Sequence, residues 1–170
     1  MNKNWKIIEK IIGGLLIAIC SVILIIIFWG INTTLQSNLE QSDLTLLNTS
    51  IYKLMITYHH QILKGLLGIL SGFLLLRNKR IGWIMSIATC LIYGIETIMI
   101  IFIKKSEEIK IFESESYLIF AGLIAILFLS LTITLTNKQF RIKYSPNRKS
   151  WIAVGIITLI FMTDLLITNG

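Results

Sequence analysis

Five long apolar stretches are the feature that most constrains the fold of this chain. They lie near residues 11–31, 59–76, 81–103, 117–136 and 151–168. A helix rises roughly 1.5 Å per residue, so each stretch can cross a hydrocarbon core of about 30 Å. Hydrophobic residues make up 55% of the 170 residues and charged residues only 15%, which is far from the composition of a soluble domain. We therefore expect an all-α, polytopic membrane helix bundle with five transmembrane helices, forming a single integral membrane domain.

Lysine and arginine gather on alternate sides of these stretches. Two of the connecting segments carry the basic residues Arg77, Lys79, Arg80, Lys138, Arg141, Lys143, Arg148 and Lys149. Further lysines precede the first stretch, whereas the other two connections mix acids with bases. Positive charge is retained on the cytoplasmic side of a membrane, so this pattern predicts a cytoplasmic N-terminus and an external C-terminus.

The same basic residues explain most of the formal net charge of +7. They are expected to contact the anionic headgroups of the lipid bilayer. Nucleic acid is not expected as a partner, because topology already accounts for the positive charge. Isoleucine, lysine and asparagine are abundant, a bias typical of AT-rich genomes that favours a bacterial protein of the cytoplasmic (inner) membrane.

Residues 42–58 have the pattern of an amphipathic helix on the outer side. Their apolar positions recur at spacings of three and four: Leu44, Leu47, Ile51, Leu54, Met55 and Tyr58. Neither glycine nor proline interrupts residues 43–64, so this helix is expected to run into the second span. The combined length of roughly 50 Å exceeds the bilayer thickness, so the helix either projects outside the membrane or bends near His59. Its apolar face would pack on other outer loops or bind a partner.

Charged residues inside the spans form the candidate functional site. The connection at residues 77–80 is so short that the second and third spans must be antiparallel neighbours. Counted from their shared inner edge, Lys64 lies roughly 18 Å up, Glu96 roughly 22 Å and His60 roughly 24 Å. A similar count along the fifth span places Asp164 about 20 Å up.

Polar and small residues also share one face on each of the two helices. The second span carries His60, Lys64, Gly68 and Gly72 at four-residue steps, and the third carries Ser86, Thr89, Tyr93 and Glu96 at steps of three and four. Gly68 and Gly72 form a small-xxx-small motif for close helix packing. An ionised carboxylate alone in hydrocarbon costs at least about 2.5 kcal/mol, so Glu96 is expected to be paired, protonated or exposed to water. We predict an intramembrane charge cluster of Lys64, Glu96, His60, Asp164 and Tyr93 in the outer half of the membrane.

Three roles are open for this cluster. The first is structural: Lys64 and Glu96 form an ion pair, or Lys64 reaches toward the outer headgroups while Asp164 lies at the interface. The second is a proton or ion pathway, and the third is a ligand or lipid site. His59 and His60 supply only half of a metal site. Neither Cys20 nor Cys90 has a second cysteine nearby in the sequence. No metal or other cofactor is therefore expected.

Catalytic motifs are missing from the sequence. It contains no HExxH, GxxxxGK[ST] or GxSxG, so no enzymatic role is expected. Elimination favours a non-catalytic membrane subunit, sensor or scaffold that binds a partner protein or a second copy of itself. The alternative is a small ion or proton channel or transporter component that uses Glu96, Lys64 and His60, although five spans show no evident inverted repeat.

Overall fold

The structure, a computed structural model, describes residues 3–39, 44–106 and 115–169. All regular secondary structure in these ranges is helical. The elements are α1 (Lys3–Leu39), α2 (Leu44–Leu76), α3 (Arg80–Ser106), α4 (Glu115–Leu135), α5 (Lys138–Tyr144) and α6 (Arg148–Asn169). The predicted all-α fold class is confirmed for this part of the chain.

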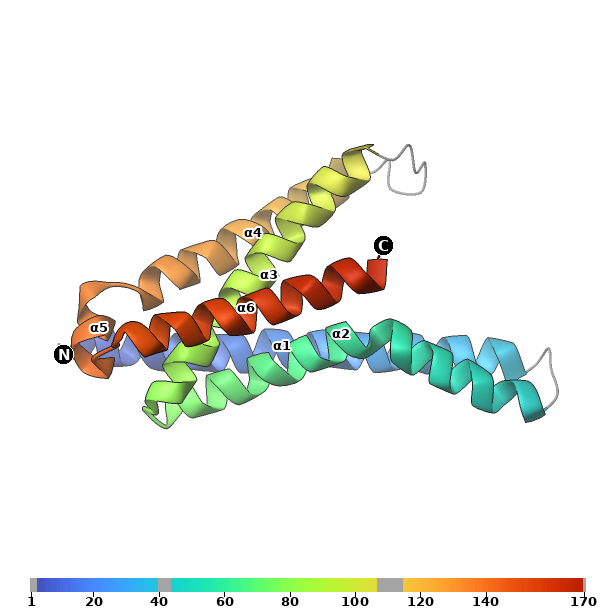
Figure 1. Ribbon diagram of the computed structural model, residues 1–170, viewed down its shortest axis with the longest axis horizontal. Coiled ribbons are helices and arrows are strands. Elements are labelled where there is room, and N and C mark those ends of the chain that lie inside the picture. The colour runs from blue at the N-terminus through green and yellow to red at the C-terminus, as the bar shows by residue number, and fades with distance from the viewer. Residues whose placement is uncertain (1–2, 40–43, 107–114, 170) are drawn as a thin grey trace.

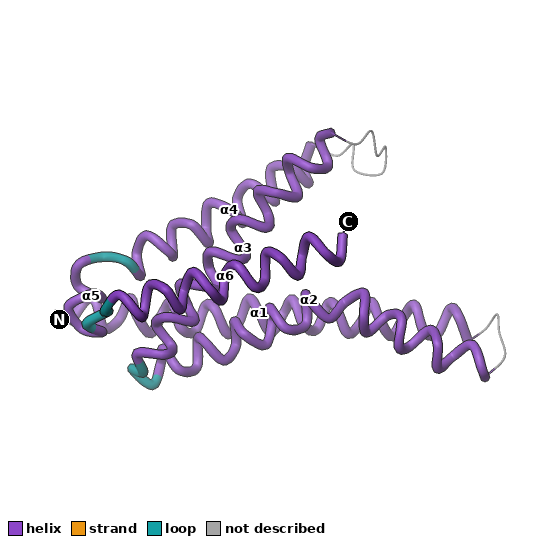
Figure 2. The backbone as a smooth tube through the Cα atoms, viewed as in Figure 1, coloured by secondary structure: helices purple, strands orange, loops and turns teal. Residues whose placement is uncertain are grey.

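Four of the helices are long and apolar enough to cross a membrane. They are α1, α2, α3 and α6, and the bent pair formed by α4 and α5 brings the number of candidate spans to five. The turns that join α2 to α3, α4 to α5 and α5 to α6 are short (Figure 2). This arrangement is compatible with a multi-span membrane protein.

The helices extend beyond the apolar stretches seen in the sequence. α1 has 37 residues, because polar segments at both ends continue the helix. α2 is one helix of 33 residues that covers both the second apolar stretch and the segment predicted to be amphipathic, from Leu44 onward. Residues 42 and 43, with which that segment was expected to begin, lie outside the described residues.

Two helix pairs form the arms of the molecule. α1 packs along α2, and α3 packs along α4. The two pairs diverge from the end at which α5 lies, and α6 runs between them (Figure 1). α6 packs mainly on α3 and also contacts α2, so it links the arms.

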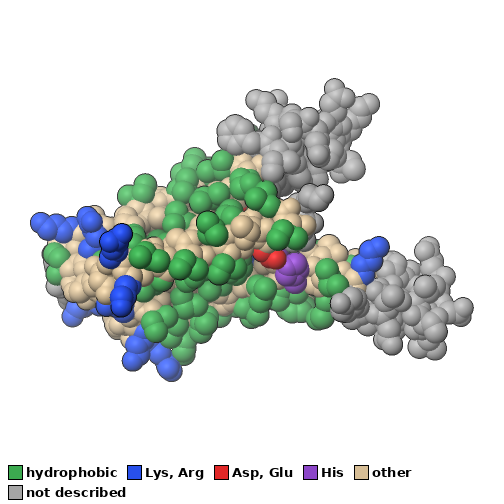
Figure 3. Space-filling view, viewed as in Figure 1, with side chains coloured by type: hydrophobic (Ala, Val, Ile, Leu, Met, Phe, Trp, Pro, Cys, Tyr) green, Lys and Arg blue, Asp and Glu red, His purple; other side chains and the backbone are tan. Residues whose placement is uncertain are grey.

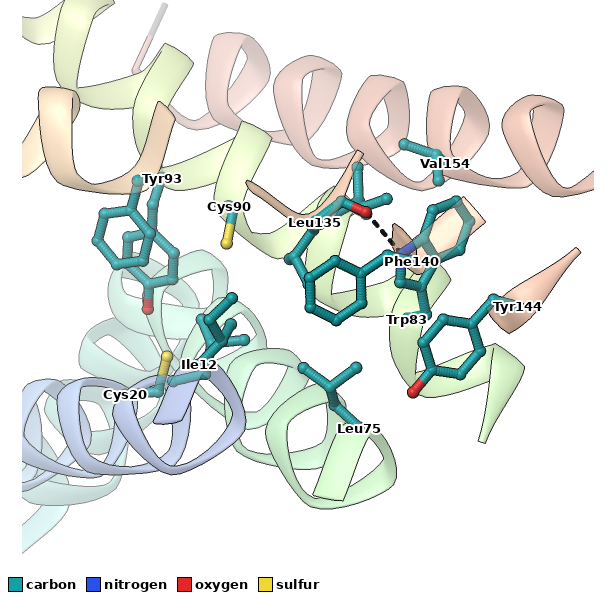
Figure 4. Packing of buried hydrophobic residues seen from close by; sticks show 14 residues of the cluster. Ile12, Cys20, Leu75, Trp83, Cys90, Tyr93, Leu135, Phe140, Tyr144 and Val154 are labelled. Carbon is teal, nitrogen blue, oxygen red and sulfur yellow. Dashed lines mark hydrogen bonds between the residues drawn. The ribbon is translucent and has the colours of Figure 1, made fainter. Parts of the chain in front are cut away.

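A buried tryptophan joins four helices at the α5 end. The indole Nε1 of Trp83 on α3 donates to the carbonyl oxygen of Leu135 at the end of α4, at 2.8 Å. Its ring centre lies 5.9 Å from that of Tyr144 on α5 and 5.5 Å from that of Trp151 on α6. Figure 4 shows Trp83 among the packed side chains, with the bond to Leu135 drawn. Side chains of four helices therefore meet in the apolar core at this end.

The helix α5 lies in a connection that we expected to be a basic loop. Asn137 caps it, because its side chain accepts a hydrogen bond from the backbone N–H of Gln139 at 3.2 Å. Phe140 and Tyr144, four residues apart, are both buried. The helix ends at Ser145, whose backbone is left-handed with φ 41°. The two aromatic side chains thus hold this short helix against the core.

Close backbone contacts fix the pairing of α2 with its neighbours. A Cβ atom on Gly72 would lie 2.6 Å from the carbonyl oxygen of Gly13 on α1. A Cβ atom on Gly68 would lie 2.1 Å from Sγ of Cys20 on α1 and 3.4 Å from Thr89 on α3. The two glycines of the predicted packing motif therefore let α2 approach α1 closely, and Gly68 also lies near α3.

Candidate functional site

Lys64 and Glu96 form a buried ion pair between α2 and α3. The Nζ atom of Lys64 donates to Oε2 of Glu96. The two residues are 3% and 2% exposed. Nζ also lies 4.6 Å from the ring centre of Tyr93, which precedes Glu96 by one helical turn. Ionic and cation–π contacts thus hold the ammonium group in an otherwise apolar region.

Two further α2 side chains face the Glu96 carboxylate. Nε2 of Gln61 donates to Oε1 of Glu96 at 2.9 Å. Nε2 of His60 lies 3.9 Å from Oε2, within the range of an ionic contact. Both carboxylate oxygens therefore have polar partners, which offsets much of the cost of burying the charge.

The network continues from His60 to α6. Nδ1 of His60 lies 2.7 Å from one carboxylate oxygen of Asp164, and Nε2 of His59 lies 3.0 Å from the other. The His59 and Asp164 side chains are 37% and 34% exposed. Figure 3 shows acidic and histidine atoms side by side on the surface. Polar contacts thus lead from the surface to the buried Lys64.

The opposite side of the ion pair is closed. Ser71, Ser86 and Thr89 are buried there, and each hydroxyl donates to a backbone carbonyl, at 2.8 Å, 3.3 Å and 2.8 Å respectively. Leu16 and Leu75, which belong to the same core cluster, are fully buried. Tyr93, which lies against Lys64, and the free cysteines Cys20 and Cys90 are also buried on this side.

All five residues of the predicted cluster lie in one region. Gln61 has no role in the sequence prediction, and His59 enters it only as the position of a bend or as half of a metal site. Gln61 lies one residue beyond His60 and three before Lys64, so helical spacing offered a signal for it. Among the described residues, no group of three His, Cys, Asp or Glu side chains is placed to hold a metal ion.

A second buried acid, Glu9, lies outside the predicted cluster. It lies on α1 and is 2% exposed. Lys143 and Tyr144 of α5 each donate to one of its carboxylate oxygens. Lys143 also donates to the side-chain oxygen of Asn78, in the turn between α2 and α3. This polar cluster ties α5 to α1 and to the α2–α3 turn.

The eight basic residues of the two predicted loops lie at the α5 end, where basic side chains gather in Figure 3. Seven of them are exposed, and Lys143 is half-buried through its pairing with Glu9. Arg80 donates to the side-chain oxygens of Asn147 and Ser150 at 2.8 Å and 2.6 Å. The guanidinium of Arg77 lies 4.3 Å from the ring centre of Phe73. Most of this positive charge is therefore available to an anionic surface.

Comparison with protein families, with curated proteins and with solved structures finds no match to this chain.

Proposed function

We propose that this chain is a non-catalytic, multi-pass membrane subunit or sensor that binds a transmembrane helix of a partner protein. It would lie in a bacterial cytoplasmic membrane as a single domain with five spans. The basic α5 end would face the cytoplasm, which puts the N-terminus inside and the C-terminus outside. The outer part of α2 would then project from the membrane or lie on its external surface.

The observation that carries this proposal is a polar pair within an apolar surface. His59 and Asp164 are each about one-third exposed. The exposed apolar residues one turn away on the same two helices include Ile56, Leu63, Ile160 and Ile167. We call these six residues the α2/α6 surface.

The depth of this surface favours a protein partner over lipid. At roughly 1.5 Å per residue, Asp164 lies about 20 Å from the inner edge of a hydrocarbon core about 30 Å thick. A partly exposed carboxylate and imidazole at that depth are unfavourable against lipid tails. Both groups already have partners, since His59 and His60 each contact one oxygen of Asp164. A neighbouring transmembrane helix, with a polar side chain among apolar residues, would shield this bonded pair from the acyl chains.

The buried ion pair supports the same role. Lys64 and Glu96 hold α2 against α3, and Asp164 attaches α6 to α2. The α2/α6 surface is thus fixed before a partner arrives, which lowers the entropic cost of binding.

Site-specific photocrosslinking in cells tests this proposal. A photoreactive residue at Leu63 or Ile160 should give one discrete protein adduct. The same residue at Ile126, an exposed position on α4 that is 67% accessible, should give none. Asp164→Asn should weaken the adduct while the protein still elutes as a folded species in detergent. Equal adducts at Leu63 and Ile126 would contradict the proposal.

The second candidate function is a proton or ion conduit. Its support is the polar series from the exposed His59 through Asp164 and His60 to Glu96 and Lys64. The hydroxyls beyond Lys64 are committed to backbone carbonyls, which argues against a continuous path. Proton flux in liposomes that Glu96→Gln abolishes would favour the conduit over the subunit.

A further inference from the structure

A pocket lies at the α5 end, away from the charge cluster between α2, α3 and α6. It has a volume of about 160 Å³. Its lining residues are Lys6, Glu9, Lys10, Leu75, Leu76 and Asn78. A single water needs a cavity of roughly 10–15 Å³, so the pocket has room for a group of several heavy atoms.

Two lysines give this pocket its charge. Lys6 and Lys10 lie one turn apart on α1, and both are exposed. Among the described residues, neither takes part in an ion pair. Like charges four residues apart on a helix repel each other. An anion placed between their ammonium groups would relieve that repulsion.

The one acid in the lining does not cancel this positive charge. Both carboxylate oxygens of Glu9 accept hydrogen bonds from α5, one from Lys143 and one from Tyr144. The Glu9 charge is thus balanced by Lys143, and the charges of Lys6 and Lys10 remain for a ligand. An anion in the pocket would gain from two cations without facing an uncompensated carboxylate.

The remaining lining residues are apolar or already bonded. Leu75 is buried and Leu76 is partly accessible. The side-chain oxygen of Asn78 accepts from Lys143, and its amide donates to the carbonyl oxygen of Leu76 at 3.4 Å. The pocket therefore combines a cationic rim with an apolar wall.

We propose that this pocket binds the phosphate group of an anionic ligand, with Lys6 and Lys10 as the cationic contacts. Two sources share this chemistry: the headgroup of an anionic phospholipid and a soluble phosphate. The apolar wall and the position at the basic end of the helices favour the phospholipid.

The test uses the full-length protein in detergent, stripped of lipid. The probes are short-chain phosphatidylglycerol, short-chain phosphatidylcholine and inorganic phosphate, and the readouts are the shift in Tm and the apparent Kd. The variant is Lys6→Gln with Lys10→Gln. The matched control is Lys138→Gln with Lys149→Gln, which removes two exposed charges from the same end outside the pocket.

We expect phosphatidylglycerol to raise the Tm of the unmodified protein more than phosphatidylcholine does. Removing both pocket lysines should raise the apparent Kd roughly 30-fold, whereas the control should stay within about threefold. Lys6→Arg with Lys10→Arg should retain binding, which separates loss of charge from loss of fold. Inorganic phosphate with the same dependence on these lysines would identify a soluble ligand instead.

Three results would overturn the proposal. The first is an unmodified protein that no probe stabilises. The second is an equal loss of binding in the pocket variant and in the control, which would mean that the whole basic end attracts anions without a specific site. The third is full binding after both pocket lysines are replaced by glutamine.

Discussion

Nδ1 of His60 lies 2.7 Å from a carboxylate oxygen of Asp164, although 104 positions separate the two residues in the sequence. This contact connects α2 to α6, two helices that otherwise touch over a small area. Because Nε2 of the same ring faces Glu96 at 3.9 Å, His60 lies between two carboxylates. Replacing it affects both helix contacts at once.

His60→Leu should therefore loosen α6 more than it loosens α3. The variant removes the buried partner of Asp164, whereas Glu96 keeps Lys64 and Gln61. Hydrogen exchange should rise along residues 155–167 and change less along residues 85–96. A control with His59→Leu, which removes the more exposed contact, should have a smaller effect. If residues 155–167 exchanged equally fast in His60→Leu and in His59→Leu, the expected order of the two variants would be wrong.

Breaking the Lys64–Glu96 pair on one side should be worse than removing it. Glu96→Gln with Lys64 retained leaves a buried ammonium without its counterion, and should lower the free energy of unfolding by about 3 kcal/mol. The double variant Lys64→Met with Glu96→Leu should lose less, because no charge remains buried. Denaturation in mixed micelles measures both. If the single and double variants were equally stable, the pair would carry no coupling energy.

Gly82→Ala should disrupt the α2–α3 turn. A Cβ atom at Gly82 would lie 2.4 Å from the backbone nitrogen of Leu75, so backbone atoms would have to move. We expect a loss of more than about 2 kcal/mol. Gly14→Ala and Gly155→Ala are matched controls, since nothing lies within 4 Å of a Cβ atom at either position. These should be neutral or stabilise the helix by up to about 1 kcal/mol.

Trp83→Phe should weaken the junction of α3 with α4. The variant keeps an aromatic ring in the core but loses the hydrogen bond to the Leu135 carbonyl, so a loss of about 1–2 kcal/mol is expected. Thermal unfolding followed by circular dichroism would measure it. Trp29, an exposed residue of α1, provides the control, and Trp29→Phe should change stability by less than about 0.5 kcal/mol.

Glu9→Gln should detach α5 from α1. The substitution removes the counterion of Lys143 and weakens the acceptor of the Tyr144 hydroxyl. Limited proteolysis should then cut residues 137–147 several times faster. A second substitution, Lys143→Met, should partly restore protection, because it removes the unpaired ammonium group. Unchanged cleavage in Glu9→Gln would show that Phe140 and Tyr144 packing alone holds α5.

Much of the charge cluster could be predicted from helical spacing and from depth counted along the helices. A short connection fixes α2 and α3 as neighbours, so counting along both helices places Lys64 near Glu96. The contact of Asp164 with α2 could not be predicted in this way. Its depth can be counted from the sequence, but which face of α6 lies against α2 depends on packing along the whole helix. His59 gains its role only from that packing, because its partner Asp164 is on α6. Gln61 contacts Glu96 on α3, and its spacing from Lys64 was a usable signal.

The α5 end could not be predicted in the same way. A helix of seven residues is too short for its apolar period to stand out, and Phe140 and Tyr144 read equally well as interfacial aromatics in a loop. The burial of Glu9 could not be predicted for the same reason, because both of its hydrogen-bond donors belong to α5. Local sequence gave the basic charge of this end, and only the tertiary arrangement reveals which acid it neutralises.

The main-chain contact at Gly82 also bears on how the protein is made. α2 and α3 leave the ribosome in succession, and their tight turn lets them pair without waiting for later segments. Lys64 and Glu96 would then neutralise each other during insertion, and neither would meet the acyl chains alone. On the proposed membrane topology, the nascent protein would therefore insert with this pair already matched, whereas Asp164 would meet His60 only once α6 has been made.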